Sequence, residues 1–176
     1  MPSLTNLVLA LAALTSTYTL AAPATLTTTN TQPALSKRFS YHPSLPGERD
    51  DYCGEANPQY SYGPSTPLAA DCQATYQPYP GPGYWLVSAG ETNAATDQWV
   101  RLAASGTCAF EVRLSEPGAN QPQVDFRFGT NDLRFYTKGH ASEWYAQDGR
   151  VSVRSGVWCS SPADGMVTVH WRIVHA

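Results

Sequence analysis

Two segments carry side chains whose types and spacing could perform acid–base chemistry. Glu111 and Arg113 alternate with apolar residues in SGTCAFEVRL, residues 105–114, and His170 and Arg172 do the same near the end of the chain. If these segments were neighbouring strands, the four side chains could converge and cleave a phosphodiester by general acid–base catalysis, as in small secreted ribonucleases. The alternative is that the charged residues solvate the outer face of an antiparallel sheet, and we favour it.

The chain shows no other pattern typical of a hydrolase or a metal site. It lacks the GxSxG, HExxH, glycine-rich phosphate-loop and paired-carboxylate motifs. It has no CxxC spacing, and only His170 and His175 are spaced like a pair of zinc ligands. A glycosidase stays an open alternative, because its two acids can come from any part of a chain. We expect a non-enzymatic protein with no catalytic residues, no metal and no cofactor.

Aromatic side chains crowd into one stretch and could form a binding surface. They are Tyr60, Tyr62, Tyr76, Tyr79, Tyr84 and Trp85. Exposed rings of this kind can stack on sugars or on a protein, so a carbohydrate-binding module is a further alternative. Its candidate surface-binding residues are Tyr79, Tyr84 and Trp85, and Pro and Gly residues around Tyr79 and Tyr84 predict that these two are exposed. We favour the simpler interpretation, in which the rings cover a Pro- and Gly-rich loop against the core.

The scaffold that positions these residues can be predicted from periodicity. Thr66 and Pro67 predict the start of a short helix, since Thr is a common N-cap and Pro is favoured at the first helical position. A second helix is expected to begin at Asp132 and to carry Trp144 on its apolar stripe. Period-two alternation predicts strands over residues 105–114, 124–128, 151–157 and 167–173, and shorter extended segments at 85–87 and 99–103. The predicted fold is α+β, an antiparallel sheet with two helices packed on one face.

Four cysteines predict two disulfides, with three possible connectivities. Cys108 shares the parity of the apolar residues of its strand, and Cys72 lies on the apolar face of the first helix, so both sulfurs should point into the core. We therefore favour Cys72–Cys108 together with Cys53–Cys159, while the other connectivities stay open. In the chain-entropy model these two bridges would contribute roughly 4 and 5 kcal/mol to the free energy of unfolding.

The first 38 residues have the composition of processing segments. Residues 1–21 contain the apolar run LVLALAAL and a small-residue cleavage site after Ala21, which predict a secretory signal peptide. Residues 22–38 form a low-complexity stretch that ends at the dibasic pair Lys37-Arg38, which predicts a propeptide. We expect a surface arm over 39–52 and a single domain over 53–176. The apolar run is too short to span a membrane.

The charge of the expected mature chain excludes one class of partner. Removing residues 1–38 lowers the number of Lys and Arg residues from 11 to 9 against 14 Asp and Glu residues, which gives a net charge of −5. Such a chain should not bind nucleic acid or anionic lipid by bulk electrostatics. We expect an extracellular monomer whose partner is a protein or a cell-wall glycan.

Seven short motifs occur in a fixed order along the chain. They are Tyr52-Cys53-Gly54-Glu55, Asp71-Cys72-Gln73, Gly106-Thr107-Cys108-Ala109-Phe110, Phe128-Gly129-Thr130-Asn131-Asp132, Gly149-Arg150-Val151, Cys159 and Val169-His170-Trp171-Arg172-Ile173. In this order they resemble the necrosis-inducing-factor domain of secreted fungal effectors, the homologues of a tomato leaf-mould extracellular effector protein. The resemblance covers about residues 50–174. It implies an apoplastic virulence factor that elicits plant cell death or acts on a microbial competitor, with no established catalytic residues to carry over.

Overall fold

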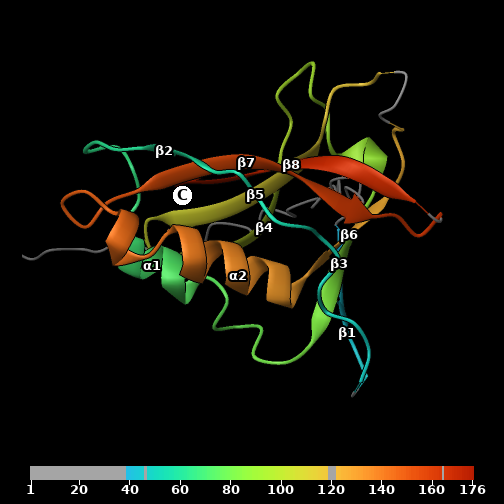
Figure 1. Cartoon of the computed structure of the whole chain (residues 1–176), viewed down its shortest axis with the longest axis horizontal. Coiled ribbons are helices and arrows are strands. Elements are labelled where there is room, and N and C mark those ends of the chain that lie inside the picture. The colour runs from blue at the N-terminus through green and yellow to red at the C-terminus, as the bar shows by residue number, and fades with distance from the viewer. Residues whose placement is uncertain (1–38, 46, 119–121, 164) are drawn as a thin grey trace, which may run out of the picture. The chain divides into compact units, whose positions relative to one another are not determined.

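The computed structural model describes residues 39–45, 47–118, 122–163 and 165–176 (Figure 1). The expected signal peptide over 1–21, the expected propeptide over 22–38 and the Lys37-Arg38 pair lie outside the described residues. The described part confirms the α+β class, with antiparallel strands, two α-helices and two disulfides.

The larger sheet has five strands in the order β2-β7-β8-β5-β4, and all its pairings are antiparallel. The last strand of the chain, β8, lies at the centre, between β7 and β5. This placement pairs Glu111 with Arg172 and Arg113 with His170 across β5 and β8. The strands are β2 (Gln59–Ser61), β4 (Val100–Ser105), β5 (Cys108–Leu114), β7 (Ser152–Ser160) and β8 (Met166–His175).

A second sheet corrects the expectation of a single sheet. It has three strands in the order β1-β3-β6: β1 (Ser40–Pro43), β3 (Gly83–Val87) and β6 (Phe126–Gly129). The segment expected as a surface arm thus contributes a paired strand, β1. The chain leaves β3 at the 3₁₀ helix η1 (Ala89–Glu91), where the Glu91 carboxylate accepts the Ser88 N–H at 2.9 Å. The next strand along the chain, β4, belongs to the larger sheet.

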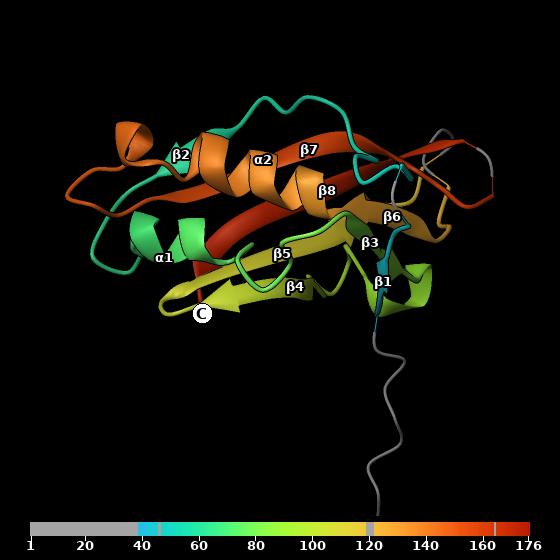
Figure 2. The ribbon, with the colours of Figure 1, turned by 90° about the horizontal axis from the view of Figure 1, so that it is seen from below.

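Both α-helices cover one face of the larger sheet, as predicted. They are α1 (Ala69–Ala74) and α2 (Thr130–His140), and Figure 2 shows them on the same side of β7, β8, β5 and β4. The rings of Tyr136 and Trp171 stack with centroids 4.7 Å apart, and Phe110 stacks on Trp171 at 5.7 Å. These fully buried rings join α2 to β8 and β5, and they place the main core between the helices and the sheet.

The helix ends differ from the prediction. Thr66 does not cap α1, because its hydroxyl donates to the Gly63 carbonyl instead and the helix begins at Ala69. The second helix ends at His140, so Trp144 lies in the 3₁₀ helix η2 (Glu143–Tyr145) and is 93% exposed. The apolar stripe therefore ends one turn earlier than its spacing predicted.

Both favoured disulfides are confirmed. Cys72–Cys108 joins α1 to β5, and Cys53–Cys159 joins the segment before β2 to β7. Cys72, Cys108 and Cys159 have no exposed surface. The bridges close sequence separations of 36 and 106 residues, so in the chain-entropy model both constrain the unfolded chain substantially.

Candidate functional site

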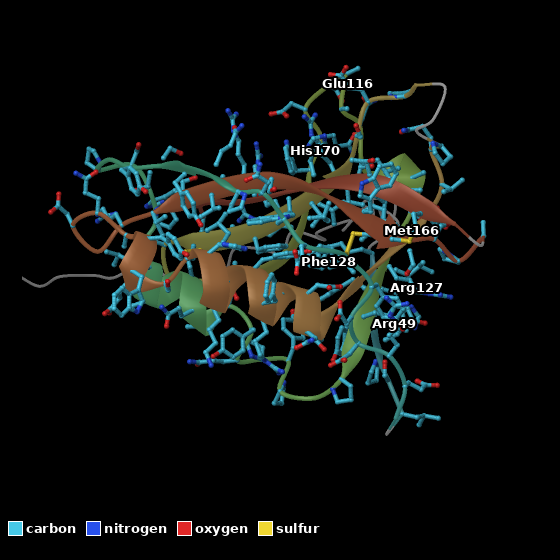
Figure 3. The ribbon with its side chains drawn as sticks, viewed as in Figure 1. Arg49, Glu116, Arg127, Phe128, Met166 and His170 are labelled. Atoms are coloured by element: carbon cyan, nitrogen blue, oxygen red, sulfur yellow. A yellow bond between two sulfur atoms is a disulfide. The ribbon has the colours of Figure 1, made fainter. Side chains whose placement is uncertain are left out.

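The candidate site lies on the face of the larger sheet that points away from the helices. Because β5 and β8 are neighbours, the four charged residues singled out in the sequence share this outer face. Figure 3 shows His170 on the opposite side of the β7–β8 ribbon from α2. The two strands are therefore neighbours, as convergence of the four side chains requires. The contacts of each side chain decide whether it can take part in acid–base catalysis.

Glu111 is buried between two arginines rather than solvated. Its Oε1 accepts hydrogen bonds from Arg101 at 3.1 and 3.2 Å, and its Oε2 accepts one from Arg172 Nε at 2.9 Å and forms an ion pair with Arg172 Nη2 at 2.8 Å. The residue is only 7% exposed. Each carboxylate oxygen thus faces a guanidinium group, which is the arrangement of a structural ion pair. The expectation that Glu111 solvates the sheet is wrong, because Arg101 and Arg172 close over it.

A short turn ahead of β4, residues 93–98, contacts this network through Asp97, and Trp99 follows the turn. Trp99 lies under the guanidinium groups of Arg172 and Arg113, at 4.1 and 4.6 Å from the ring centroid. Asp97 accepts the Trp99 indole N–H at 2.7 Å and forms ion pairs with the same two arginines, at 3.7 and 3.4 Å. The indole hydrogen bond, followed by the charges of Arg172 and Arg113, lowers the pKa of Asp97. The carboxylate therefore stays ionised under mildly acidic conditions.

Local sequence explains why this turn forms. The Asn93 side-chain oxygen accepts the N–H groups of Ala95 and Thr96 at 2.9 and 3.2 Å, while Asn93 and Gln98 pair through their backbones. Asp97 adopts a φ of 52°, a conformation that Asp tolerates better than most residues. Sequence reasoning missed Asp97, Trp99 and Arg101 as parts of the site, because it predicted an extended segment over 99–103 but gave no indication of which strands this part of the chain contacts.

His170 is partly buried and lies beside a pocket. Burial lowers the pKa of its imidazole, the positive charge of Arg113 acts in the same direction, and the negative charge of Glu116 opposes them. A Cβ atom placed on Gly156, its cross-strand partner, would lie 3.4 Å from the imidazole ring. The pocket has a volume of about 340 Å³ and is also bordered by Asn57, Gln59 and Arg154.

A second buried carboxyl group lies elsewhere, at the start of α2. Asp132 is 3% exposed and accepts backbone N–H groups from Gly129 at 2.8 Å, Tyr52 at 2.9 Å and Cys53 at 3.2 Å. Burial, and next a hydrogen bond with the Asp51 carboxyl, raise its pKa to about 8, while the N–H donors act in the opposite direction. This group ties the Cys53 segment to the helix.

One of the three candidate surface-binding aromatic residues is buried. Trp85 is 1% exposed and lies in the core, so the prediction that it contributes to a binding surface is wrong. Tyr79 and Tyr84 are partly buried rather than freely exposed. Tyr79 packs edge-on against Trp85 at 4.8 Å, and Tyr84 stacks on His42 at 5.0 Å. The alternation of β3 explains this, because it turns Trp85 inward.

Tyr84 belongs to a cluster of rings and cations on the smaller sheet. The Arg127 guanidinium lies 5.6 Å from the Tyr84 ring centroid and 5.8 Å from that of Tyr52, and Arg49 lies 5.4 Å from the Tyr52 ring (Figure 3). These contacts hold the Arg49–Tyr52 segment against β3 and β6. The cluster therefore has a structural explanation.

The described ranges contain neither a candidate metal centre nor a helix that could span a membrane. Within them, no group of three or more His, Cys, Asp or Glu side chains is arranged to hold a metal ion. Among the helices of the same residues, none is long and apolar enough to cross a membrane.

Comparison with known proteins gives one family. The model of the Hce2 family, described as "pathogen effector; putative necrosis-inducing factor", matches residues 52–159. The matched segment runs from the residue before the first cysteine to the last cysteine, and it contains both disulfides and most of the candidate site. No curated protein matches the chain. Since the match covers more than half of its residues, the chain belongs to this family of pathogen effectors.

Proposed function

We propose that the chain is a secreted effector that elicits plant cell death by binding a host target through the outer face of its larger sheet. Membership of a necrosis-inducing effector family supports this proposal at the family level. The two disulfides support an extracellular site of action, because such bridges persist in oxidising compartments. Secretion would follow removal of residues 1–21, and maturation would follow cleavage after Arg38.

The single observation that favours binding over catalysis is the state of Glu111. A general base needs a lone pair that can reach the proton it abstracts. Both oxygens of Glu111 are instead occupied by Arg101 and Arg172, and the residue is buried beneath them. The same network holds Arg172 and Arg113 in fixed positions, which is what a preorganised recognition surface requires.

Leaf infiltration tests the proposal directly. Cells expressing the full chain would supply the secreted protein, which is purified from the medium with its disulfides intact and infiltrated into leaves of several plants. We expect necrosis with the wild type, a weaker response with Arg154→Glu on the sheet face, and a wild-type response with Lys138→Glu on α2. Both residues are exposed in the folded protein. Each substitution replaces a cation by Glu, so the two variants have the same net charge. No response in any host would contradict the cell-death proposal, and equal responses of the two variants would contradict the role of the sheet.

Processing has its own test. Amino-terminal sequencing of the secreted protein should begin at Phe39, and the variant that replaces both Lys37 and Arg38 by Ala should begin at Ala22. A wild-type protein that begins at Ala22 would contradict the propeptide, and retention of the chain inside the cell would contradict the signal peptide.

A small hydrolase is the second candidate, and one observation favours it. Glu111 and His170 share a face on neighbouring strands, and the lowered pKa of His170 would keep its imidazole neutral and able to accept a proton at neutral pH. A ribonuclease assay on the secreted protein tests this candidate. Loss of RNA cleavage in His170→Ala would support it, and absence of cleavage by the wild type would end it.

A further inference from the structure

The pocket beside His170 has the size and lining of a small-molecule site. Its volume of about 340 Å³ is within the range of sites for such ligands, roughly 300–1,000 Å³. It lies where β2 begins, so Asn57 and Gln59 border it from the edge of the sheet, and Arg113 and Arg154 border it from β5 and β7. With His170 on β8, its borders come from four strands and the segment before β2.

A glycine keeps the pocket open. Gly156 lies opposite His170 in the register of β7 and β8, and it is the one position of β7 that has no side chain. A Cβ there would contact His170 Cε1 and Nδ1 at 3.4 Å. A branched side chain would extend further over the imidazole and into the space between Arg113 and Arg154. The depth of the pocket thus depends on this glycine.

The charges around the pocket favour an anion. Three guanidinium groups and two carboxylates form one chain of ion pairs, Arg101–Glu111–Arg172–Asp97–Arg113, which leaves one positive charge in excess. Arg154 adds a second, since its only side-chain partner within the described ranges is the Gln59 amide oxygen, at 3.1 Å. Glu116, whose negative charge acts on His170, offsets one of these two positive charges. This excess occurs in a protein whose expected mature form has a net charge of −5.

Two features point to donors that still lack a partner. The Arg113 Nε–H is buried, and no acceptor for it exists among the described side chains and backbone. The Arg154 guanidinium uses Nε for Gln59, so its terminal N–H groups remain for a ligand. Guanidinium groups bind carboxylate, sulfate and phosphate groups through paired N–H donors. The Asn57 and Gln59 amides beside them can donate to and accept from hydroxyl groups.

We propose that this pocket binds an acidic sugar, with its carboxylate, sulfate or phosphate group held by Arg113 and Arg154 and its hydroxyl groups by Asn57 and Gln59. The proposal rests on the proposed recognition role of this sheet face and names the class of ligand. A long polyanion such as a nucleic acid fits less well, because the negative net charge of the chain repels a ligand that extends beyond the pocket.

Isothermal titration calorimetry on the secreted protein tests the proposal by measuring the affinity for each probe. The probes are galacturonic acid and glucose 6-phosphate as acidic sugars, galactose and glucose as their neutral counterparts, and inorganic phosphate as a bare oxyanion. We expect saturable binding of at least one acidic sugar, about tenfold or more tighter than its neutral counterpart or phosphate. Equal binding of acidic and neutral sugars, equal binding of phosphate, or no saturable binding of either acidic sugar would overturn the proposal.

Three variants locate the binding. Arg154→Gln removes an exposed charge and should weaken binding of the acidic sugar about tenfold. Gly156→Val keeps the charges, fills the pocket and should abolish binding. Lys138→Gln on α2 removes the same charge as Arg154→Gln and should bind like the wild type. Thermal unfolding of each variant checks the fold, and Arg154→Gln remains decisive if Gly156→Val does not fold. Wild-type binding by Arg154→Gln would overturn the assignment.

The infiltration and titration results separate the two proposals. Binding of an acidic sugar without necrosis contradicts the effector proposal but leaves the pocket assignment intact. Necrosis that requires Arg154, in a protein that binds no acidic sugar, contradicts the pocket assignment but leaves the recognition role intact.

Discussion

Two buried carboxyl groups, Glu111 and Asp132, are held in opposite ways. Glu111 lies on the sheet face between the side chains of Arg101 and Arg172. Asp132 lies at the start of α2, and its oxygens accept three backbone N–H groups, which come from two segments far apart in the sequence. The partners of the first group are side-chain cations, whereas the partners of the second group are backbone N–H groups in fixed positions.

The difference determines what happens when each group is lost. Arg101 and Arg172 have side chains that are 50% and 30% exposed, so water can replace Glu111 as their partner. The N–H groups around Asp132 belong to a tightly packed junction, where a Cβ on Gly129 would collide with the Asp50 carbonyl. These N–H groups cannot turn toward water, so removal of the Asp132 carboxyl group would leave them without a hydrogen-bond partner. We therefore expect Asp132 to matter for stability and Glu111 to matter more for the shape of the surface.

The largest expected effect is that of Asp132→Ala. It leaves three backbone N–H groups without an acceptor, two of them at buried residues, and should lower the free energy of unfolding by about 3 kcal/mol or more. Chemical denaturation of the disulfide-bonded protein measures the change. Asp125→Ala is the matched control, because Asp125 accepts one N–H, from Ala89 at 3.0 Å, and should cost about 1 kcal/mol. Equal losses for the two variants would contradict the special role of Asp132.

The pH dependence of stability should report on Asp132. The folded-state pKa of Asp132 is raised to about 8, so the folded protein binds this proton more tightly than the unfolded chain does. Its contribution is complete below about pH 4 and decreases as the pH rises toward 8, with a slope of up to about 1.4 kcal/mol per pH unit. Denaturation midpoints between pH 4 and 8 measure this slope. Asp132→Asn should flatten the slope, and an unchanged slope in this variant would refute the assignment.

A smaller effect is expected for Glu111→Gln. The amide keeps the shape of the side chain but loses the charge that holds Arg101 and Arg172, so the free energy of unfolding should decrease by about 1–2 kcal/mol. Glu116→Gln, at an exposed position, is the control and should change it by less than about 0.5 kcal/mol. A loss in Glu111→Gln as large as that in Asp132→Ala would remove the proposed difference between the two groups.

Arg101→Ala should have the smallest effect. The side chain is half exposed, and Arg172 still holds the other oxygen of Glu111, so we expect a loss of at most about 1 kcal/mol. The same denaturation series in low and high salt measures the change and its screening. A larger, salt-independent loss would show that the Arg101–Glu111 pair behaves as a buried pair.

The helices, the strands and the two disulfides were largely predictable, because residue types and their spacing along the chain indicate them. Alternation identified β5 and β8, and the inward parity of Cys108 together with the helical stripe of Cys72 identified their bridge. The division into two sheets was not predictable in the same way. It depends on pairings between strands that are distant in sequence, such as β1 with β3 and β3 with β6.

The residues of the candidate site were also only partly predictable. Parity placed Glu111 and His170 on outward faces, and family resemblance identified an effector. Parity contains no information on whether an outward face stays in water. The turn that carries Asp97, together with Trp99 after it, covers that face, and its partners Arg113 and Arg172 come from strands far along the chain.

The sequence by itself determined the alternation of inward and outward side chains in β5 and β8, the favoured cysteine pairs and the family. Each of these follows from residue type, spacing or the order of motifs along the chain. Tertiary structure decided that Glu111 is buried between arginines, that Trp85 lies in the core and that Gly156 opens a pocket beside His170. These properties depend on which strands become neighbours, and that choice is made by the packing of the whole domain.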